Sequence, residues 1–146
     1  MSGSGKSVNR GRGIARKFAM QALYQWQLNP QPAEIVLAQF RQEQDFGDAD
    51  GEYFDELVSR CIAQHAELEA QIAAHVDRPL EQLDPVEHAI LLLSMYELTG
   101  RPDVPYKVVI NEAVALTKRF GATDSHKYVN AVLDRAATVH RSAERH

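Results

Sequence analysis

The five apolar residues 89–93, AILLL, constrain the fold more than any other stretch of this chain. They follow residues 84–87, DPVE, which combine an acidic N-cap, a proline at the first helical position and a glutamate that can reach back to the cap. These signals predict a helix that continues to Leu98, with Gly100 as its left-handed C-terminal exit. Because the centre of this helix is apolar on nearly all sides, it should be the central helix of the fold.

Helical periodicity extends through the rest of the sequence. Apolar residues at 15, 18, 19, 22, 23 and 26 follow one face of a helix. The predicted helices span residues 14–28, a short segment with Ile35, Val36, Leu37 and Phe40, a long stretch from an Asp50 N-cap to about 76, residues 85–98, residues 105–120 closed by Gly121, and a last helix capped by Thr123 or Asp124. The expected buried positions of the third and last helices are Phe54, Leu57, Val58, Cys61, Ile62, Leu68, Ile72, Val129, Val132, Leu133, Ala136, and His140 or Val139. The predicted class is therefore all-α.

Length and composition set the scale of the fold. With 146 residues, of which 45% are hydrophobic and 25% charged, the chain has the proportions of one soluble domain with a real core. We expect a flexible basic tail over residues 1–9, a helical domain over 10–140 and a short tail over 141–146. The apolar runs are too short for a membrane span and no secretory signal follows the basic N-terminus, so we expect a cytoplasmic protein.

Charge is distributed unevenly along the chain. Residues 1–17 hold five basic and no acidic side chains, residues 18–100 hold three basic and fifteen acidic ones, and residues 101–146 hold eight basic and five acidic ones. The two basic ends could meet as a surface for a polyanion, leaving the acidic middle for solvent or a basic protein partner. The alternative is a flexible arm that only aids solubility.

Motifs for catalysis or cofactor binding do not hold up. Residues 3–7, GSGKS, lack the earlier glycine and the strand of a phosphate-binding loop. The six histidines include no pair spaced for zinc, and Cys61 falls on an apolar helical stripe, where a buried structural thiol is expected. We therefore expect no enzyme, no metal and no cofactor.

Two helices carry a tyrosine among cations on the side away from the apolar stripe. In the first, Lys17 and Tyr24 lie opposite the stripe, and Arg10 joins them if the helix extends back far enough. In the last, Tyr128 lies about 100° off the stripe, close in angle to Arg135. An aromatic ring among cations suits unpaired bases, because the ring stacks while the cations neutralise phosphates. The alternative is that Tyr24 packs beneath a neighbouring helix.

Residues 124–127, DSHK, begin the last helix. They offer a carboxylate, a hydroxyl and backbone N–H groups to base edges or phosphates, and Lys127 lies on the exposed side. Ordinary N-capping by Asp124 is the alternative role, and both can hold together.

Three blocks of the sequence resemble the NusB family of bacterial transcription antitermination factors. The first is residues 15–26, ARKFAMQALYQW, and the other two are residues 104–113, VPYKVVINEA, and 120–130, FGATDSHKYVN. The resemblance runs from about Arg10 to Ala137. It implies an all-helical fold of two packed subdomains, near residues 10–77 and 78–140, and an activity of RNA binding rather than catalysis.

The resemblance also implies partners and site residues. NusB proteins pair with NusE, a small-subunit ribosomal protein, bind the single-stranded boxA element of ribosomal RNA leader transcripts, and join NusA, NusG and RNA polymerase to suppress termination. The family's N-terminal arginines map to Arg10, Arg12 and Arg16, and its stacking aromatics to Tyr24 and Tyr128, with Asp124 beside the latter. The acid associated with NusE binding maps to Glu87. Some relatives self-associate, which leaves a homodimer open.

The sequence departs from the family pattern at a few positions. Gly11 and Gly13 interrupt the usual run of N-terminal arginines, and a tail over residues 1–7 precedes it. Tyr128 stands where phenylalanine is common, which keeps the stacking face and adds a hydroxyl. Ala131 replaces a frequent glycine, a change that a helix tolerates.

Other functional classes fit the sequence less well. Ribosomal RNA cytosine methyltransferases carry a similar helical domain, but we expect no methyl-donor domain because the sequence ends at His146. A small hydrolase would need a nucleophile and a base at a suitable spacing, which we do not find. A helical protein-binding module without sequence-specific RNA binding remains the main alternative.

Overall fold

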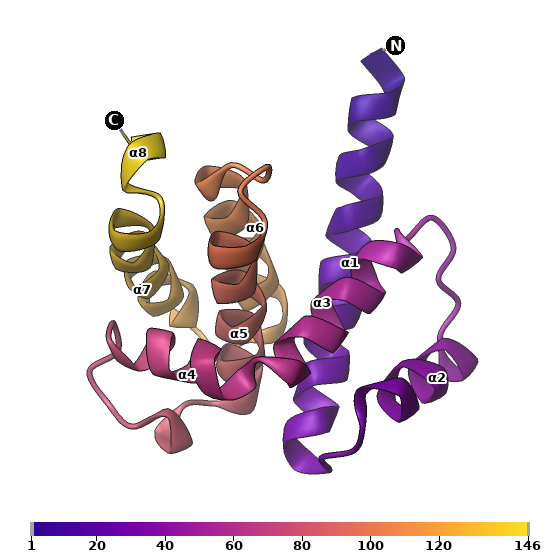
Figure 1. Ribbon diagram of the computed structural model, residues 1–146, viewed down its shortest axis with the longest axis horizontal. Coiled ribbons are helices and arrows are strands. Elements are labelled where there is room, and N and C mark those ends of the chain that lie inside the picture. Colours follow the sequence, from indigo (N-terminus) through magenta and orange to yellow (C-terminus); the bar gives the residue numbers. More distant parts are fainter. Residues whose placement is uncertain (1, 146) are drawn as a thin grey trace. The chain divides into compact units, whose positions relative to one another are not determined.

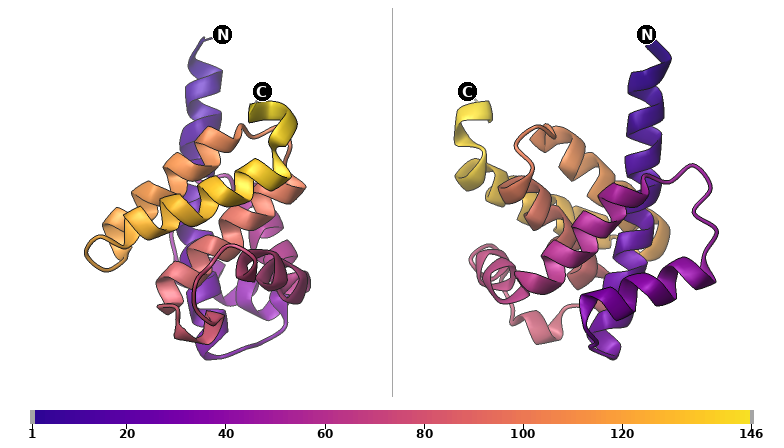
Figure 2. Two further views of the ribbon diagram at one scale, coloured as in Figure 1. Left: turned by 90° about the vertical axis from the view of Figure 1, so that its left-hand side faces the viewer. Right: turned by 45° about the vertical axis from the view of Figure 1, so that its right-hand side comes forward.

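The computed structural model describes residues 2–145, with side chains described for residues 7–144. Within these residues every regular element is a helix, as the sequence predicts. The chain divides into two compact units, Met1–Ala63 and Gln64–His146 (Figures 1 and 2). The first unit contains α1 (Ser2–Leu28), α2 (Ala33–Glu43) and α3 (Gly51–Ala63), and the second contains α4 (His65–Ala73), the 3-10 helix η1 (Leu80–Gln82), α5 (Pro85–Gly100), α6 (Tyr106–Phe120), α7 (Ser125–His140) and α8 (Ser142–Arg145).

Phenylalanine rings hold the first unit together. Phe18 of α1, Phe40 of α2, Phe54 of α3 and Phe46 of the intervening loop have neighbouring ring centroids between 4.9 and 6.3 Å apart. Such edge-on and stacked pairs stabilise a core beyond the area that they bury. The rings come from all three helices and the loop, so they join α1, α2 and α3 into one core.

The first helix begins at Ser2, well before the predicted start at residue 14. Gly11 explains part of the extension, because it is buried and its carbonyl oxygen accepts a hydrogen bond from the Asp50 backbone N–H at 3.0 Å. A Cβ at Gly11 would lie 3.2 Å from the Asp48 carbonyl oxygen, so only glycine allows this close approach without a shift. These contacts come from a distant loop, which helical periodicity cannot reveal. The flexibility expected of residues 1–9 stays a prediction.

The predicted long third helix is wrong: the structure contains two helices, α3 and α4, separated at Gln64, where φ is −109° and ψ is 17°. Leu68 follows Cys61 by seven residues, so the apolar stripe keeps its phase across the break and gives no sign of it. The helices separate because they serve different cores, α3 packing on α1 and α4 on α5. The boundary between the units therefore lies at 63/64, earlier than the 77/78 boundary expected from the resemblance.

The second unit is built around α5, as predicted. Helices α4, α6 and α7 all pack on it, and residues 89–98 are buried throughout. The left-hand view of Figure 2 shows α6 and α7 running beside each other in this unit. The Asp84 carboxylate caps α5 by accepting a hydrogen bond from the Val86 N–H at 2.7 Å, and Pro85 occupies the first turn.

The left-handed exit predicted at Gly100 is wrong. Gly100 is the last residue of α5, and among the described residues only Gly47 and Asp124 have positive φ. A Cβ at Gly100 would lie 2.8 Å from the Tyr96 ring, so the glycine makes room for an aromatic side chain. The carbonyl groups at the end of α5 are capped instead by the side chain of Arg141, the residue that directly follows α7.

Most predicted core positions are confirmed, including Cys61, which is fully buried. Some expectations differ: Leu37 and Ile62 are only partly buried, and Ile35 is exposed. Of the alternatives His140 and Val139, the first is partly buried and the second is 62% exposed, while α7 buries Ala137 beside the predicted Ala136. Within the described part of the chain no helix is both long and apolar enough to cross a membrane.

Candidate nucleic-acid interface

Three of the predicted site residues form a stripe along α1. Arg10, Lys17 and Tyr24 are seven residues apart, so each is rotated by only about 20° from the last and displaced by about 10 Å along the axis. The Arg10 side chain is 71% exposed and its Nη2 lies 3.2 Å from the Asp48 carboxylate. Lys17 and Tyr24 are partly exposed. The stripe therefore presents two cations and one aromatic ring.

Arg12 and Arg16 lie on a different side of α1. Their guanidinium carbons stand 4.5 and 5.5 Å from the centroid of the buried Tyr53 ring of α3, within the range of cation–π attraction. Arg12 keeps partial exposure, whereas Arg16 is only 3% exposed. Arg16 therefore packs between α1 and α3, and the RNA-binding role predicted for it stays a prediction.

Tyr128, in the second unit, lies against two residues that sequence reasoning missed. Its hydroxyl donates a hydrogen bond to Oδ1 of Asp77 at 3.2 Å, and the guanidinium carbon of Arg78 stands 4.5 Å from its ring centroid. Arg78 Nε also donates to Oδ1 of Asp77, at 3.1 Å. The sequence gives little sign of the other two members of this cluster, because Asp77 and Arg78 precede Pro79 just beyond the predicted end of the third helix near residue 76. Asp77, Arg78 and Tyr128 are hereafter called the Tyr128 cluster.

The ionisation of the Tyr128 cluster follows from these contacts. Hydrogen bonds from Arg78 and then from Tyr128 lower the pKa of the Asp77 carboxyl, and the bond to Asp77 is the largest cause that raises the pKa of Arg78. Burial is the largest cause that raises the pKa of the Tyr128 phenol. At neutral pH the cluster therefore contains one carboxylate, one guanidinium and one neutral phenol.

Asp124 has a strained backbone at the start of α7. Its φ is 67°, in the left-handed region, which costs a residue other than glycine about 1 to 2 kcal/mol. Its side chain makes no capping hydrogen bond, so the capping role considered for it is wrong. Its carboxylate lies 3.6 Å from Lys127 Nζ instead, and both side chains are largely exposed. The predicted pair therefore remains accessible to a ligand.

Two further predicted residues belong to the second unit. Glu87, expected to contact a protein partner, is 9% exposed and lies close enough to Arg78 that its charge helps to raise the pKa of Arg78. Arg135 donates a hydrogen bond from Nη2 to the His75 carbonyl oxygen at 2.6 Å. Glu87 is thus a largely buried neighbour of the Tyr128 cluster rather than a freely exposed acid.

Acidification should destabilise this region through His75. Burial first, and then the positive charges of His140 and Arg135, lower the pKa of His75 below 6.5. The folded state favours the neutral His75 ring, because the pKa of His75 is lower in the folded protein than in the unfolded chain. The stabilisation of the folded state by the neutral ring is complete above pH 6.5, and it is lost as the pH falls through the lowered pKa of the folded state. We expect the urea midpoint to drop between about pH 7 and about pH 5, and to drop less in H75Q. An NMR titration that placed the His75 pKa at or above its ordinary value would contradict this.

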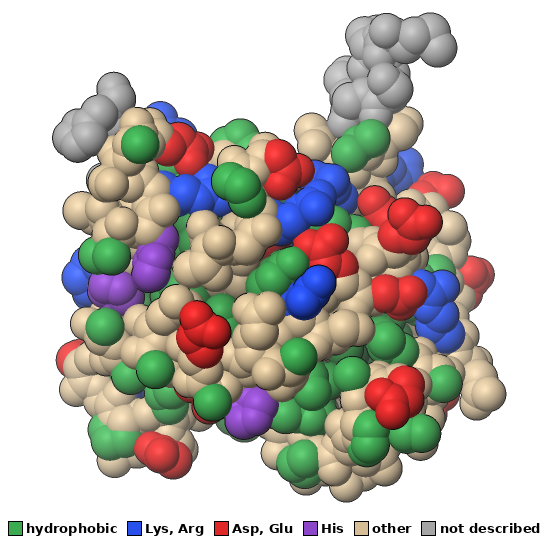
Figure 3. Space-filling model, viewed as in Figure 1, with side chains coloured by type: hydrophobic (Ala, Val, Ile, Leu, Met, Phe, Trp, Pro, Cys, Tyr) green, Lys and Arg blue, Asp and Glu red, His purple; other side chains and the backbone are tan. Residues whose placement is uncertain are grey.

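Basic and acidic side chains lie intermixed on the face of the molecule that Figure 3 draws. Acidic side chains lie there next to lysine and arginine side chains, and the ion pairs of Arg10 and Arg78 agree with this.

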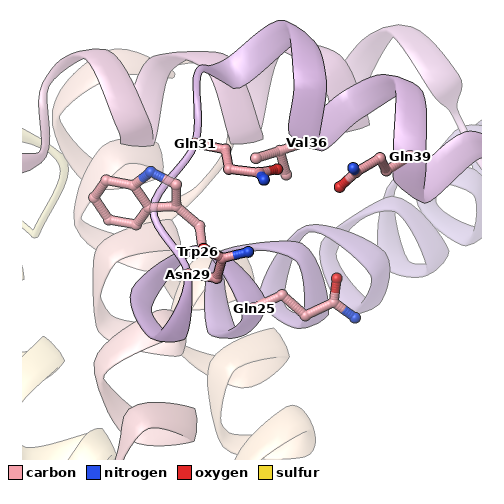
Figure 4. Close-up of a pocket in the computed structure, with 6 residues that line it drawn as sticks. All are labelled: Gln25, Trp26, Asn29, Gln31, Val36 and Gln39. Carbon is pink, nitrogen blue, oxygen red and sulfur yellow. The ribbon is translucent and has the colours of Figure 1, made fainter.

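The first unit also has a small recess of about 70 Å³ between α1 and α2, lined by Trp26, Val36 and four carboxamide side chains, Gln25, Asn29, Gln31 and Gln39 (Figure 4). It is far smaller than the several hundred Å³ of typical small-molecule sites. Among the described residues no group of three or more His, Cys, Asp or Glu is placed to hold a metal ion.

Comparison with known proteins gives consistent matches. The model of the NusB family matches residues 14–138. The chain is 51% identical over 134 residues to the transcription antitermination protein NusB of Teredinibacter turnerae, covering 91% of each sequence. Its fold resembles NusB of T. maritima, with a TM-score of 0.76, 26% identity, and coverage of 87% of this chain and 90% of that one. It also resembles a chain in a solved complex of antitermination factors NusB and NusE with double-stranded RNA, with a TM-score of 0.75, 25% identity, and coverage of 89% and 98%.

Proposed function

This chain belongs to the NusB family, and on that premise we propose that it is an RNA-binding transcription antitermination factor. In this proposal it pairs with NusE and binds the single-stranded boxA element of ribosomal RNA leader transcripts. The observation that carries the proposal is the family match over residues 14–138, which includes both Tyr24 of α1 and Tyr128 of α7. The larger assembly would include NusA, NusG and RNA polymerase.

Each unit carries residues that we propose contact RNA. On α1, Arg10, Arg12 and Lys17 supply cations for backbone phosphates, and the partly exposed Tyr24 ring supplies a stacking surface. On α7, Lys127 supplies a further cation, Tyr128 a second ring and Asp124 an exposed carboxylate that can accept from a base edge. Phosphate contacts then provide most of the affinity, and the two rings favour unpaired bases.

Binding of NusE would use the acidic part of the chain. The stretch from residue 18 to residue 100 holds fifteen acidic side chains against three basic ones, which complements a basic ribosomal protein. Glu87 remains our proposed partner residue, although its low exposure means that it would contact NusE only at an edge or stabilise Arg78 beside it.

The proposal is tested by fluorescence anisotropy with a boxA-type RNA, with and without purified NusE, over a series of salt concentrations. We expect tight binding that NusE strengthens, that weakens steeply with salt and that a scrambled RNA does not show. No preference for the boxA-type sequence even with NusE present would favour the alternative of a helical protein-binding module.

Truncation of Tyr24 tests the stacking surface of α1. We expect Y24A to lose roughly 1 to 3 kcal/mol of RNA affinity, because the ring can no longer stack on a base. The ring is partly exposed, so circular dichroism should show unchanged helicity. Y106A, which removes another partly exposed tyrosine outside the proposed site, serves as the matched control and should bind like the parent. Equal affinity of Y24A and the parent would remove Tyr24 from the site.

A further inference from the structure

We propose that Arg78 and Tyr128 act together as one stacking unit for an unpaired RNA base, with Asp77 as the residue that positions both. This inference rests on the proposed RNA-binding function and deepens it, since it adds two residues and a mode of recognition. The base would lie on the outer face of the Arg78 guanidinium, in a stack of phenol, guanidinium and base. Arginine planes and aromatic rings are the two kinds of protein surface on which unpaired bases stack.

The geometry of the Tyr128 cluster favours this arrangement. The guanidinium carbon of Arg78 stands 4.5 Å from the centroid of the Tyr128 ring, within the range of cation–π attraction. The side chain of Arg78 is still 45% exposed, which leaves room for a ligand on the side away from the ring. A long, exposed arginine would ordinarily sample many rotamers. Here it is held by two contacts, one with the ring and one with Asp77.

Asp77 holds the two members of the stack in register. Its Oδ1 accepts from Tyr128 Oη at 3.2 Å and from Arg78 Nε at 3.1 Å, so one carboxylate oxygen anchors both side chains. Asp77 engages only Nε of Arg78, which leaves the Nη groups as donors toward a ligand. This anchoring needs the Tyr128 hydroxyl, which a phenylalanine at this position would lack.

Charge compensation indicates a base rather than a phosphate as the ligand. The charge of Arg78 is balanced by Asp77, and Glu87 adds a second negative charge nearby. A compensated guanidinium releases few counterions when it meets RNA, so its contribution should depend little on salt. Stacking has this property because every base has an uncharged face. The Tyr128 cluster therefore supplies preference for unpaired bases, while Arg12 and Lys17 of α1 supply most of the salt-dependent affinity.

The decisive variant is R78K, which keeps the positive charge and removes the planar group. Its binding to single-stranded boxA-type RNA is measured with the full chain and NusE over a salt series. In parallel, 2-aminopurine placed at successive RNA positions reports stacking through quenching of its fluorescence. We expect R78K to bind about tenfold more weakly with an unchanged salt slope, and to lose quenching at one RNA position only.

R41K is the matched control. Arg41 also pairs with an aspartate, Asp55 at 2.8 Å, also stands over an aromatic ring, Phe46 at 4.8 Å, and has a similar side-chain exposure of 43%. It lies outside the proposed site, so R41K should bind RNA and quench like the parent. Urea unfolding of both variants checks that the fold is retained.

The positioning role of Asp77 is tested by a double-mutant cycle. We expect D77A to weaken binding about threefold in the parent and to have no further effect in R78K, because Asp77 acts through Arg78. A purely structural role would weaken both backgrounds equally and would overturn this assignment.

The outcomes separate the two proposals. If the parent binds boxA-type RNA and R78K matches it in affinity and quenching, the stacking unit is overturned and the proposed function stands. Weaker binding by R78K with a shallower salt slope would identify Arg78 as a phosphate contact and would also overturn the stacking unit. If the parent binds no RNA, the proposed function fails and this inference fails with it.

Discussion

Replacement of Leu92 by alanine is expected to lower the free energy of unfolding by about 3 kcal/mol. Leu92 is fully buried near the middle of α5, the helix on which α4, α6 and α7 pack. Truncation removes the transfer free energy of the lost methyl and methylene groups and leaves a cavity that the surrounding helices can fill only in part. Urea unfolding followed by far-ultraviolet circular dichroism measures the change.

The matched control for L92A is V139A, which truncates an apolar side chain of the same unit at a position 62% exposed. Its free energy of unfolding should stay within about 0.5 kcal/mol of the parent. A loss in L92A as small as in V139A would show that α5 is not the centre of this core.

Replacement of Arg141 by alanine is expected to lower the free energy of unfolding by a similar amount, about 3 kcal/mol. Arg141 is 7% exposed, and its guanidinium donates to the carbonyl oxygens of Glu97, Leu98 and Arg101 at 3.1, 2.8 and 2.8 Å. It also pairs with Glu144. The carbonyl oxygens of Glu97 and Arg101 also accept from the backbone N–H groups of Arg101 and Val104, but Leu98 has a proline four residues later and lacks such a donor. Loss of the guanidinium therefore leaves the Leu98 carbonyl oxygen unsatisfied, removes a second hydrogen bond from the other two and leaves a cavity in place of a buried side chain.

Two variants sharpen this test. R141K keeps the charge, but a single ammonium lacks the planar guanidinium group that reaches several carbonyl groups. The free energy of unfolding of R141K should therefore lie between that of the parent and that of R141A. R119A removes an exposed arginine from the end of α6 and should change stability little. If R141A unfolded at the same urea concentration as R119A, Arg141 would not be the cap of α5.

Local sequence patterns predicted the helices and much of the core. The all-α class, the Asp84 cap, α5 as central helix, α6 after Pro105 and the buried stripe of α7 all follow from spacing and capping residues within a few turns of each other. The same helical-wheel reasoning placed Tyr24, Lys17 and Lys127 away from the core, and the structure leaves each of them at least partly exposed. These features are local, because a helix repeats every few residues and its caps adjoin its ends.

Features of the candidate site that depend on distant contacts were not predictable in this way. Arg16 shares a sequence block with Lys17, yet the Tyr53 ring of α3 buries it. Arg78 was not predicted as a site residue, and only the fold places it over Tyr128, fifty residues later in the chain. Asp124 had the residue type of an N-cap but adopts a left-handed backbone and pairs with Lys127.

The sequence by itself determined which segments are helices and which of their faces are apolar, because both depend on residues within a few turns. Only the tertiary structure decided where α3 ends and α4 begins, which cations are buried, and which carboxylate holds Arg78 and Tyr128 together. Each of these depends on side chains brought close by packing, and no periodicity along the chain records that proximity.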